Sequence, residues 1–84
     1  MFGISLAKVR TMSDEFLKKL YEICEGEYRI VGRYKVGTAV RISKYQTDDI
    51  VDDLDGMGLI KKIGETKILL TFEGKEQVES SDSE

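Results

Sequence analysis

The 84-residue chain contains no histidine and only one cysteine, Cys24. Histidine is the commonest metal ligand and general base in proteins, so its absence removes most acid–base and metal chemistry. Zinc would need a cage made of carboxylates alone, outside its usual nitrogen and sulfur ligand sets. No histidine is present to activate Cys24 as a nucleophile. The sequence therefore predicts no catalytic site, metal site or cofactor, and we do not expect an enzyme.

Long apolar runs are also missing. No stretch approaches the roughly 20 residues that a transmembrane helix needs. The first ten residues, MFGISLAKVR, lack the basic start, the long apolar stretch and the small-residue cleavage site of a signal peptide. A lone cysteine cannot form an intramolecular disulfide and is typical of a reducing compartment. We expect a cytoplasmic protein without a membrane partner, with Cys24 as a small core residue of the first helix.

Glycine-rich phosphate loops are absent, because the eight glycines are scattered and form no GxGxxG or GxxxxGK[ST] pattern. What remains is a chain with 40% apolar and 35% charged residues. That balance is typical of one globular domain with a small core. A chain this short buries only about 60–65% of its unfolded surface, so a partner could add to a modest stability.

Apolar periodicity predicts three helices, over residues 13–25, 33–42 and 44–57. Ser13 can cap the first helix and Gly26 can end it. The segment 27–31 is predicted as a short strand or an extended link. Gly37 costs about 1 kcal/mol inside a helix, which indicates close packing against a neighbour.

The third helix has the clearest boundaries. Ser43 is its predicted N-cap, and Gln46 follows at the spacing of a capping box. After Gly58, residues 59–63 and 67–71 form two strand-like runs around a compact turn, which predicts a hairpin. Thr71 could then cap a short last turn of helix over 72–78. The acidic, serine-rich end, ESSDSE, has nothing to bury and is expected to be disordered.

Three motifs in this order resemble the winged helix-turn-helix family, including MarR-like transcriptional regulators. They are VGTAVRIS at 36–43, KYQTDDIVDDLDGMGLI at 44–60 and LLTFEGKE at 69–76. The resemblance implies an α+β, mostly α fold: a winged helix-turn-helix with a three-helix core and a two-stranded β-wing. The resemblance covers about residues 13–79, and we expect a single domain over 1–79 with an N-terminal extension, 1–12, followed by an acidic, disordered tail, 80–84. Its predicted core contains Leu17, Leu20, Val36, Val40, Val51, Leu54, Leu59 and Leu69.

The family resemblance also implies double-stranded DNA binding and transcription regulation. Residues 27–47 carry five basic side chains and one acidic one, and the hairpin carries three lysines and one glutamate. Such cations would hold phosphates, and the first turn of the third helix would approach base edges. The expected phosphate contacts are Arg33, Lys35, Arg41, Lys44, Lys61, Lys62 and Lys67, and the expected base contacts are Tyr45, Gln46 and Thr47.

An acidic run opposes this expectation. Residues 48–58 contain five aspartates and no basic residue, and the whole chain has a net charge of −3. Asp48, Asp49 and Asp52 are expected on the outward side of the third helix, where they would repel phosphates. The alternative is a protein–protein interaction module, or a small subunit of a larger assembly, that uses this acidic helix. The residues alone leave both hypotheses open.

The family resemblance implies a homodimer, because winged-helix regulators are usually symmetric dimers on palindromic sites. The N-terminal extension is a candidate for the dimer contact. The apolar side chains of residues 1–12 include Phe2, Ile4, Leu6, Val9 and Met12. They could pack on a second copy of the chain or cover their own core.

Overall fold

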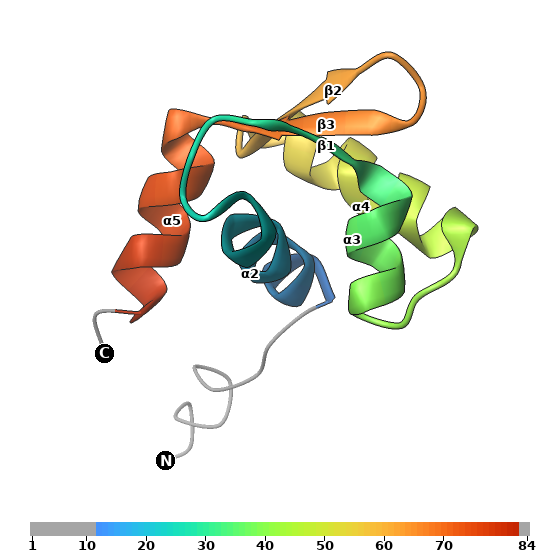
Figure 1. Cartoon of the computed structure of the whole chain (residues 1–84), viewed down its shortest axis with the longest axis horizontal. Helices are drawn as coiled ribbons and strands as arrows, with labels where there is room; N and C mark the ends of the chain where they lie inside the picture. Colours follow the sequence, from blue (N-terminus) through green and yellow to red (C-terminus); the bar gives the residue numbers. More distant parts are fainter. Residues whose placement is uncertain (1–11, 83–84) are drawn as a thin grey trace.

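The computed structural model describes residues 12–82. Within this range the chain forms helices and strands in the following order: α2 (Met12–Cys24), β1 (Ile30–Gly32), α3 (Arg33–Ala39), α4 (Lys44–Gly56), β2 (Ile60–Ile63), β3 (Lys67–Leu70) and α5 (Phe72–Asp82). The three strands make one antiparallel sheet in the order β1-β3-β2. The sheet lies over α2, α3 and α4, and α5 stands beside α2 (Figure 1). The role predicted for residues 1–11 lies outside the described residues.

The predicted fold class is confirmed: the protein is α+β, mostly α, with a winged-helix-like arrangement of a three-helix core and a β-hairpin. The hairpin has a third strand beside it. Residues 27–31, predicted as a strand or a link, supply the start of β1, which pairs with β3 through Ile30–Leu69, Val31–Ile68 and Gly32–Lys67. A helix–turn–helix unit thus follows directly from an edge strand of the sheet.

The start of α4 confirms the predicted capping box. The Gln46 backbone N–H donates to Ser43 Oγ at 3.1 Å, and the Ser43 N–H donates to Gln46 Oε1 at 3.0 Å. The predicted close approach at Gly37 is also present, because a β-carbon there would overlap Thr47 on α4. The turn between α3 and α4 is therefore held at both ends by local contacts.

Helix α3 ends at Ala39, earlier than predicted. Arg41 adopts a left-handed conformation with φ of 66°. The N–H of Ile42 donates to Gly37 O, and the N–H of Arg41 donates to Thr38 O. This is the hydrogen-bond pattern of a Schellman motif, which closes a helix by satisfying its last carbonyls.

The hydrophobic core lies between the helices and the inner side of the sheet. Its buried members are Phe16, Leu17, Leu20, Cys24, Val36, Ile50, Val51, Leu54, Ile60, Ile68, Leu70 and Val78. Val40 and Leu59 pack against this cluster and are partly buried. Cys24 is a free core thiol, as predicted. The prediction that Leu69 belongs to the core is wrong. Side chains alternate along a strand, and β3 turns Ile68 and Leu70 inward, so Leu69 faces away.

Helix α5 is longer than the short turn predicted for 72–78 and takes in most of the tail predicted to be disordered. Thr71 caps it, since Thr71 Oγ1 accepts from the N–H of Gly74 at 3.0 Å. Val78 is buried, and the Tyr21 hydroxyl on α2 donates to Glu79 Oε2 at 2.9 Å. These contacts with α2 stabilise a helical end that the residue composition alone does not favour.

Candidate functional site

The outward side of α4 is the surface that the sequence marked as a candidate. Thr47, Ile50, Val51 and Leu54 are buried, so the opposite side of the helix points to solvent. That side carries Tyr45, Asp49, Asp52 and Asp53, which we call the α4 face; all four are exposed. Tyr45 is 86% exposed. Residues three and four apart are neighbours on a helix, so the aspartates lie next to one another and to Tyr45.

Asp48 lies at the margin of this face and bonds inward. Its Oδ1 accepts a hydrogen bond of 2.8 Å from the Tyr34 hydroxyl and lies 3.6 Å from Arg33 Nη1. The hydrogen bond to Asp48 is the main reason why the pKa of Tyr34 lies above its ordinary value of 10.0. The outward charge predicted for Asp48 is thus partly neutralised by α3.

Arg33 is 6% exposed, and its guanidinium lies under the hairpin turn. Its Nη2 donates to the carbonyl oxygens of Gly64 and Lys67, at 3.3 and 3.2 Å, and its backbone N–H donates to Thr66 O at 2.8 Å. Arg33 therefore joins α3, α4 and the hairpin.

A second link joins the hairpin to α4. Lys62 Nζ lies 2.8 Å from Asp52 Oδ1. Their hydrogen bond is the main cause that lowers the pKa of Asp52 and raises the pKa of Lys62. The pair joins the strand β2 to α4. Because both side chains remain accessible to water, the pair adds little to the stability of the fold.

The structure corrects two of the ten predicted DNA contacts. Arg33 is buried and bonded to the hairpin, as described above. Thr47 is 1% exposed, packs against Gly37, and donates from Oγ1 to Ser43 O at 2.8 Å. Neither side chain is available to a partner. Thr47 precedes Ile50 by three residues and Val51 by four, so helix periodicity also places it on the apolar side of α4, and here that signal outweighs its place in the first turn.

The three hairpin lysines do not share one surface. Lys61 and Lys62 are consecutive in β2, so their side chains point to opposite sides of the sheet. Lys62 is on the side of α4, where it pairs with Asp52. Lys61 lies opposite Leu69, and Lys67 lies opposite Gly32 and Ile63, which places both lysines on the outer side of the sheet.

Four predicted contacts remain exposed: Lys35 in the first turn of α3, and Arg41, Lys44 and Tyr45 around the α3–α4 turn. Gln46 is exposed too, but its side-chain oxygen is used by the capping box. Lys44 Nζ sits 5.3 Å from the centre of the Tyr34 ring. Tyr34 was not predicted as a site residue. Nothing in the sequence links it to Asp48, fourteen positions away, because only the packing of α3 on α4 brings them together.

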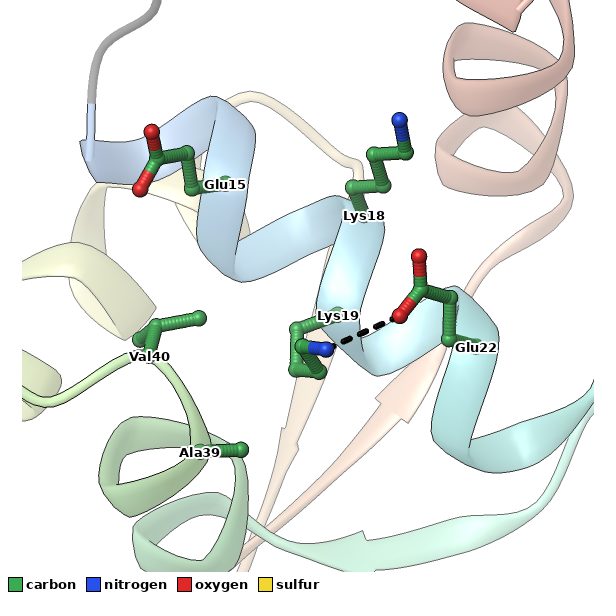
Figure 2. Close-up of a pocket in the computed structure, with 6 residues that line it drawn as sticks. All are labelled: Glu15, Lys18, Lys19, Glu22, Ala39 and Val40. Carbon is green, nitrogen blue, oxygen red and sulfur yellow. Dashed lines mark hydrogen bonds and ion pairs between the residues drawn. The ribbon is translucent and has the colours of Figure 1, made fainter.

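A shallow groove lies elsewhere, between α2 and the end of α3. Figure 2 shows four charged side chains of α2, namely Glu15, Lys18, Lys19 and Glu22, and across from them Ala39 and Val40. Lys19 and Glu22 form an ion pair of 2.9 Å. The lining has two acidic and two basic side chains and no nucleophile, so it does not indicate a catalytic site or a site for a charged ligand.

Residues 12–82 lack the features of two other kinds of site. They contain no group of three or more acidic or cysteine side chains arranged to hold a metal ion. They also contain no helix whose length and apolarity would let it cross a membrane. Within these residues the α4 face is the best-defined candidate site, because it combines several exposed charges with an exposed aromatic side chain.

Comparison of the chain with protein-family models, with curated proteins and with solved structures finds no match. The resemblance to winged helix-turn-helix proteins thus depends on the three motifs and on the order of the elements.

Proposed function

We propose that this protein is a winged-helix-like protein-interaction module whose α4 face binds a basic segment of a partner protein. The observation that carries the proposal is the α4 face itself: a highly exposed tyrosine beside three exposed aspartates. The only cation that pairs with these aspartates within residues 12–82 is Lys62, on Asp52. Membership of the winged helix-turn-helix family is part of the proposal, because α3, α4 and the hairpin follow in that order.

The same geometry counts against the DNA-binding alternative. A recognition helix in the major groove would bring Asp49 and Asp53 toward phosphates, which carry about one charge per 1.7 Å of duplex. Lys62 is occupied by Asp52, and Lys61 and Lys67 lie on the outer side of the sheet. The cations left near α4 are Arg41 and Lys44, which lie at the start of this helix and not along its face.

A protein partner uses these groups better. Tyrosine is enriched among the residues that dominate interface energies, because it buries a large area and keeps a polar tip. Asp49 and Asp53 would attract lysine or arginine and fix the register of the bound segment. A cytoplasmic location fits this role and agrees with the free thiol of Cys24, which is buried in the core.

The decisive measurement compares partners and variants of the full chain. Proteins retained from a cell extract by the immobilised domain are quantified for Tyr45→Ala and for Asp49→Asn/Asp53→Asn. Loss of Tyr45 should weaken binding of the true partner by about 30-fold or more, as for an aromatic side chain that dominates an interface. Phe72→Ala and Glu76→Gln, at exposed positions on α5, are matched controls that should retain the partner.

A fluorescence-anisotropy titration with mixed-sequence duplex DNA, at low and physiological salt, tests the alternative. We expect no saturable binding at physiological salt. Saturable binding that weakens with salt, is lost in Lys44→Ala and tightens in Asp49→Asn would instead establish DNA as the partner.

A further inference from the structure

The outer side of the sheet has an unusual composition for a small antiparallel sheet. Such sheets commonly place polar residues on the side that faces water. Here the register puts Ile30, Leu69 and Lys61 in one row and Gly32, Lys67 and Ile63 in the next. We call these six positions the outer sheet face. Three are large and apolar, two are lysines and none is acidic.

Ile30 is the most exposed apolar member of this face, at 57%. It belongs to β1, which lies at one edge of the sheet and pairs only with β3. The four residues 27–30 are all exposed, so this edge is open to solvent over its first part. An exposed edge strand with an apolar side chain is a template for adding another strand.

The backbone of β1 is in the right phase for such an addition. The Arg33 N–H bonds to Thr66 O, which makes Arg33–Thr66 a hydrogen-bonded pair. Hydrogen-bonded and non-hydrogen-bonded pairs alternate in an antiparallel ladder, so Ile30 and Gly32 are not bonded to β3. Their N–H groups, and the carbonyl of Ile30, therefore point to the open edge. The carbonyl of Gly32 is the N-cap carbonyl of α3 and is taken by the helix.

Gly32 adds a chemical preference. It has no side chain, and a β-carbon there would meet only the β-carbon of Lys35, at 3.9 Å, so the surface between the open edge and Lys67, its partner on β3, is low at this position. A carboxylate on an added strand opposite Gly32 could reach Lys67 across this low surface. The residue two positions along would stand beside Ile30, on the same side of the sheet.

We propose that the β1 edge and the outer sheet face bind an extended peptide segment that carries an apolar residue and an acidic residue two positions apart. The peptide would add as a fourth strand to β1. Its apolar side chain would cover Ile30 and Leu69, and its carboxylate would pair with Lys67. This surface is separate from the α4 face and prefers the opposite charge.

A second copy of this chain is a poorer occupant. Two outer sheet faces packed together would bring Lys61 and Lys67 of each copy toward those of the other. Three strands of three or four residues also offer much less than the roughly 800 Å² per partner that a stable dimer usually buries. A short peptide suits both the charge and the area.

The test uses isotopically labelled full chain and a short capped peptide that repeats threonine–valine–threonine–glutamate. A control peptide has lysine in place of glutamate. We expect saturable binding of the acidic peptide, chemical-shift changes centred on β1 and β3, and protection of the Ile30 and Gly32 amides from hydrogen exchange. The control peptide should bind about two- to fivefold more weakly, as for loss of one favourable exposed ion pair.

Three variants make the test specific. Lys67→Glu should weaken binding of the acidic peptide by about two- to fivefold, while Arg41→Glu, a charge reversal outside the sheet, should not. Gly32→Val should also weaken it by raising the surface at this position; φ of −67° at Gly32 lets any residue stand there. The proposal would be overturned by any of three results: unchanged affinity in Lys67→Glu, chemical-shift changes centred outside β1 and β3, or no protection of the Ile30 and Gly32 amides. Self-association of the chain that Ile30→Lys abolishes would overturn it too, since a second copy would then be the occupant.

Discussion

Gly37 of α3 packs against the side chain of Thr47 on α4 so closely that a β-carbon at position 37 would overlap Thr47 Oγ1. Alanine is normally worth about 1 kcal/mol more than glycine inside a helix. Here overpacking should outweigh that gain, and Gly37→Ala should lower the free energy of unfolding by about 1–3 kcal/mol. Urea unfolding measures it.

Two variants control for this effect. Gly56→Ala, on α4, has nothing within 4 Å of the new β-carbon and should leave stability unchanged or raised. Gly37→Ala/Thr47→Ala removes the overlapping oxygen and should recover part of the loss. An unchanged stability of Gly37→Ala would mean that α3 and α4 do not approach as described.

Leu54 and Leu69 form a second pair of tests. Leu54 is buried in the core, so Leu54→Ala should cost about 2–5 kcal/mol through lost burial and a cavity. Leu69 faces outward from β3, and Leu69→Ala should cost only roughly 1 kcal/mol. Equal costs, measured by urea unfolding of both variants, would contradict the strand register.

Removal of Arg33 should loosen the hairpin. Arg33→Ala leaves the Gly64 and Lys67 carbonyls without their buried donor, which should cost about 1–3 kcal/mol. Arg33→Lys should not restore the loss, because an ammonium lacks the planar fork of donors. Hydrogen exchange of residues 63–67 should accelerate in both variants. Arg29→Ala, an exposed arginine, is the control and should leave this exchange unchanged.

The Asp52–Lys62 pair should make stability depend on acid. The pKa of Asp52 is lowered in the folded protein, so folding favours its charged form. The resulting stabilisation is present above the ordinary pKa of 3.8 and is lost as pH falls through the lowered folded value. Asp52→Asn should therefore be less stable than the parent at neutral pH and equally stable in strong acid.

Unfolding curves at a series of pH values check this dependence. Asp53→Asn is the matched control, because Asp53 lies on the same helix without a lysine partner within the described residues. A gap between parent and Asp52→Asn that stays constant with pH would rule out the pair as its source.

Local signals in the sequence were enough for most of the fold. The capping box at Ser43 and Gln46, the glycine at position 37 and the hairpin turn each have a short-range physical cause, and all three are present. Leu69 was misplaced because Ile68, Leu69 and Leu70 are three consecutive apolar residues, so periodicity could not say which side of β3 faces the core. The length of α5 depends on contacts with α2 that no local pattern reports.

The candidate site was harder to predict for the same reason. Charge and residue type identified the acidic α4 and its exposed Tyr45. They do not show whether a nearby cation is already buried or paired within the protein. The burial of Arg33 and the pairing of Lys62 with Asp52 are long-range contacts, set only when the hairpin folds back onto α4. The opposite directions of Lys61 and Lys62 follow from strand alternation once the register is known.

The buried guanidinium of Arg33 also has a consequence for communication within the domain. Arg33 follows β1 directly in the chain, and its guanidinium lies 3.6 Å from Asp48 at the margin of the α4 face. A strand added to β1 would stiffen the backbone beside it, and a partner on α4 would restrain the helix that holds Asp48. Any free energy by which one ligand alters the affinity of the other must be the same in both directions. Arg33 is thus the natural position at which to measure thermodynamic coupling between two ligands that never touch.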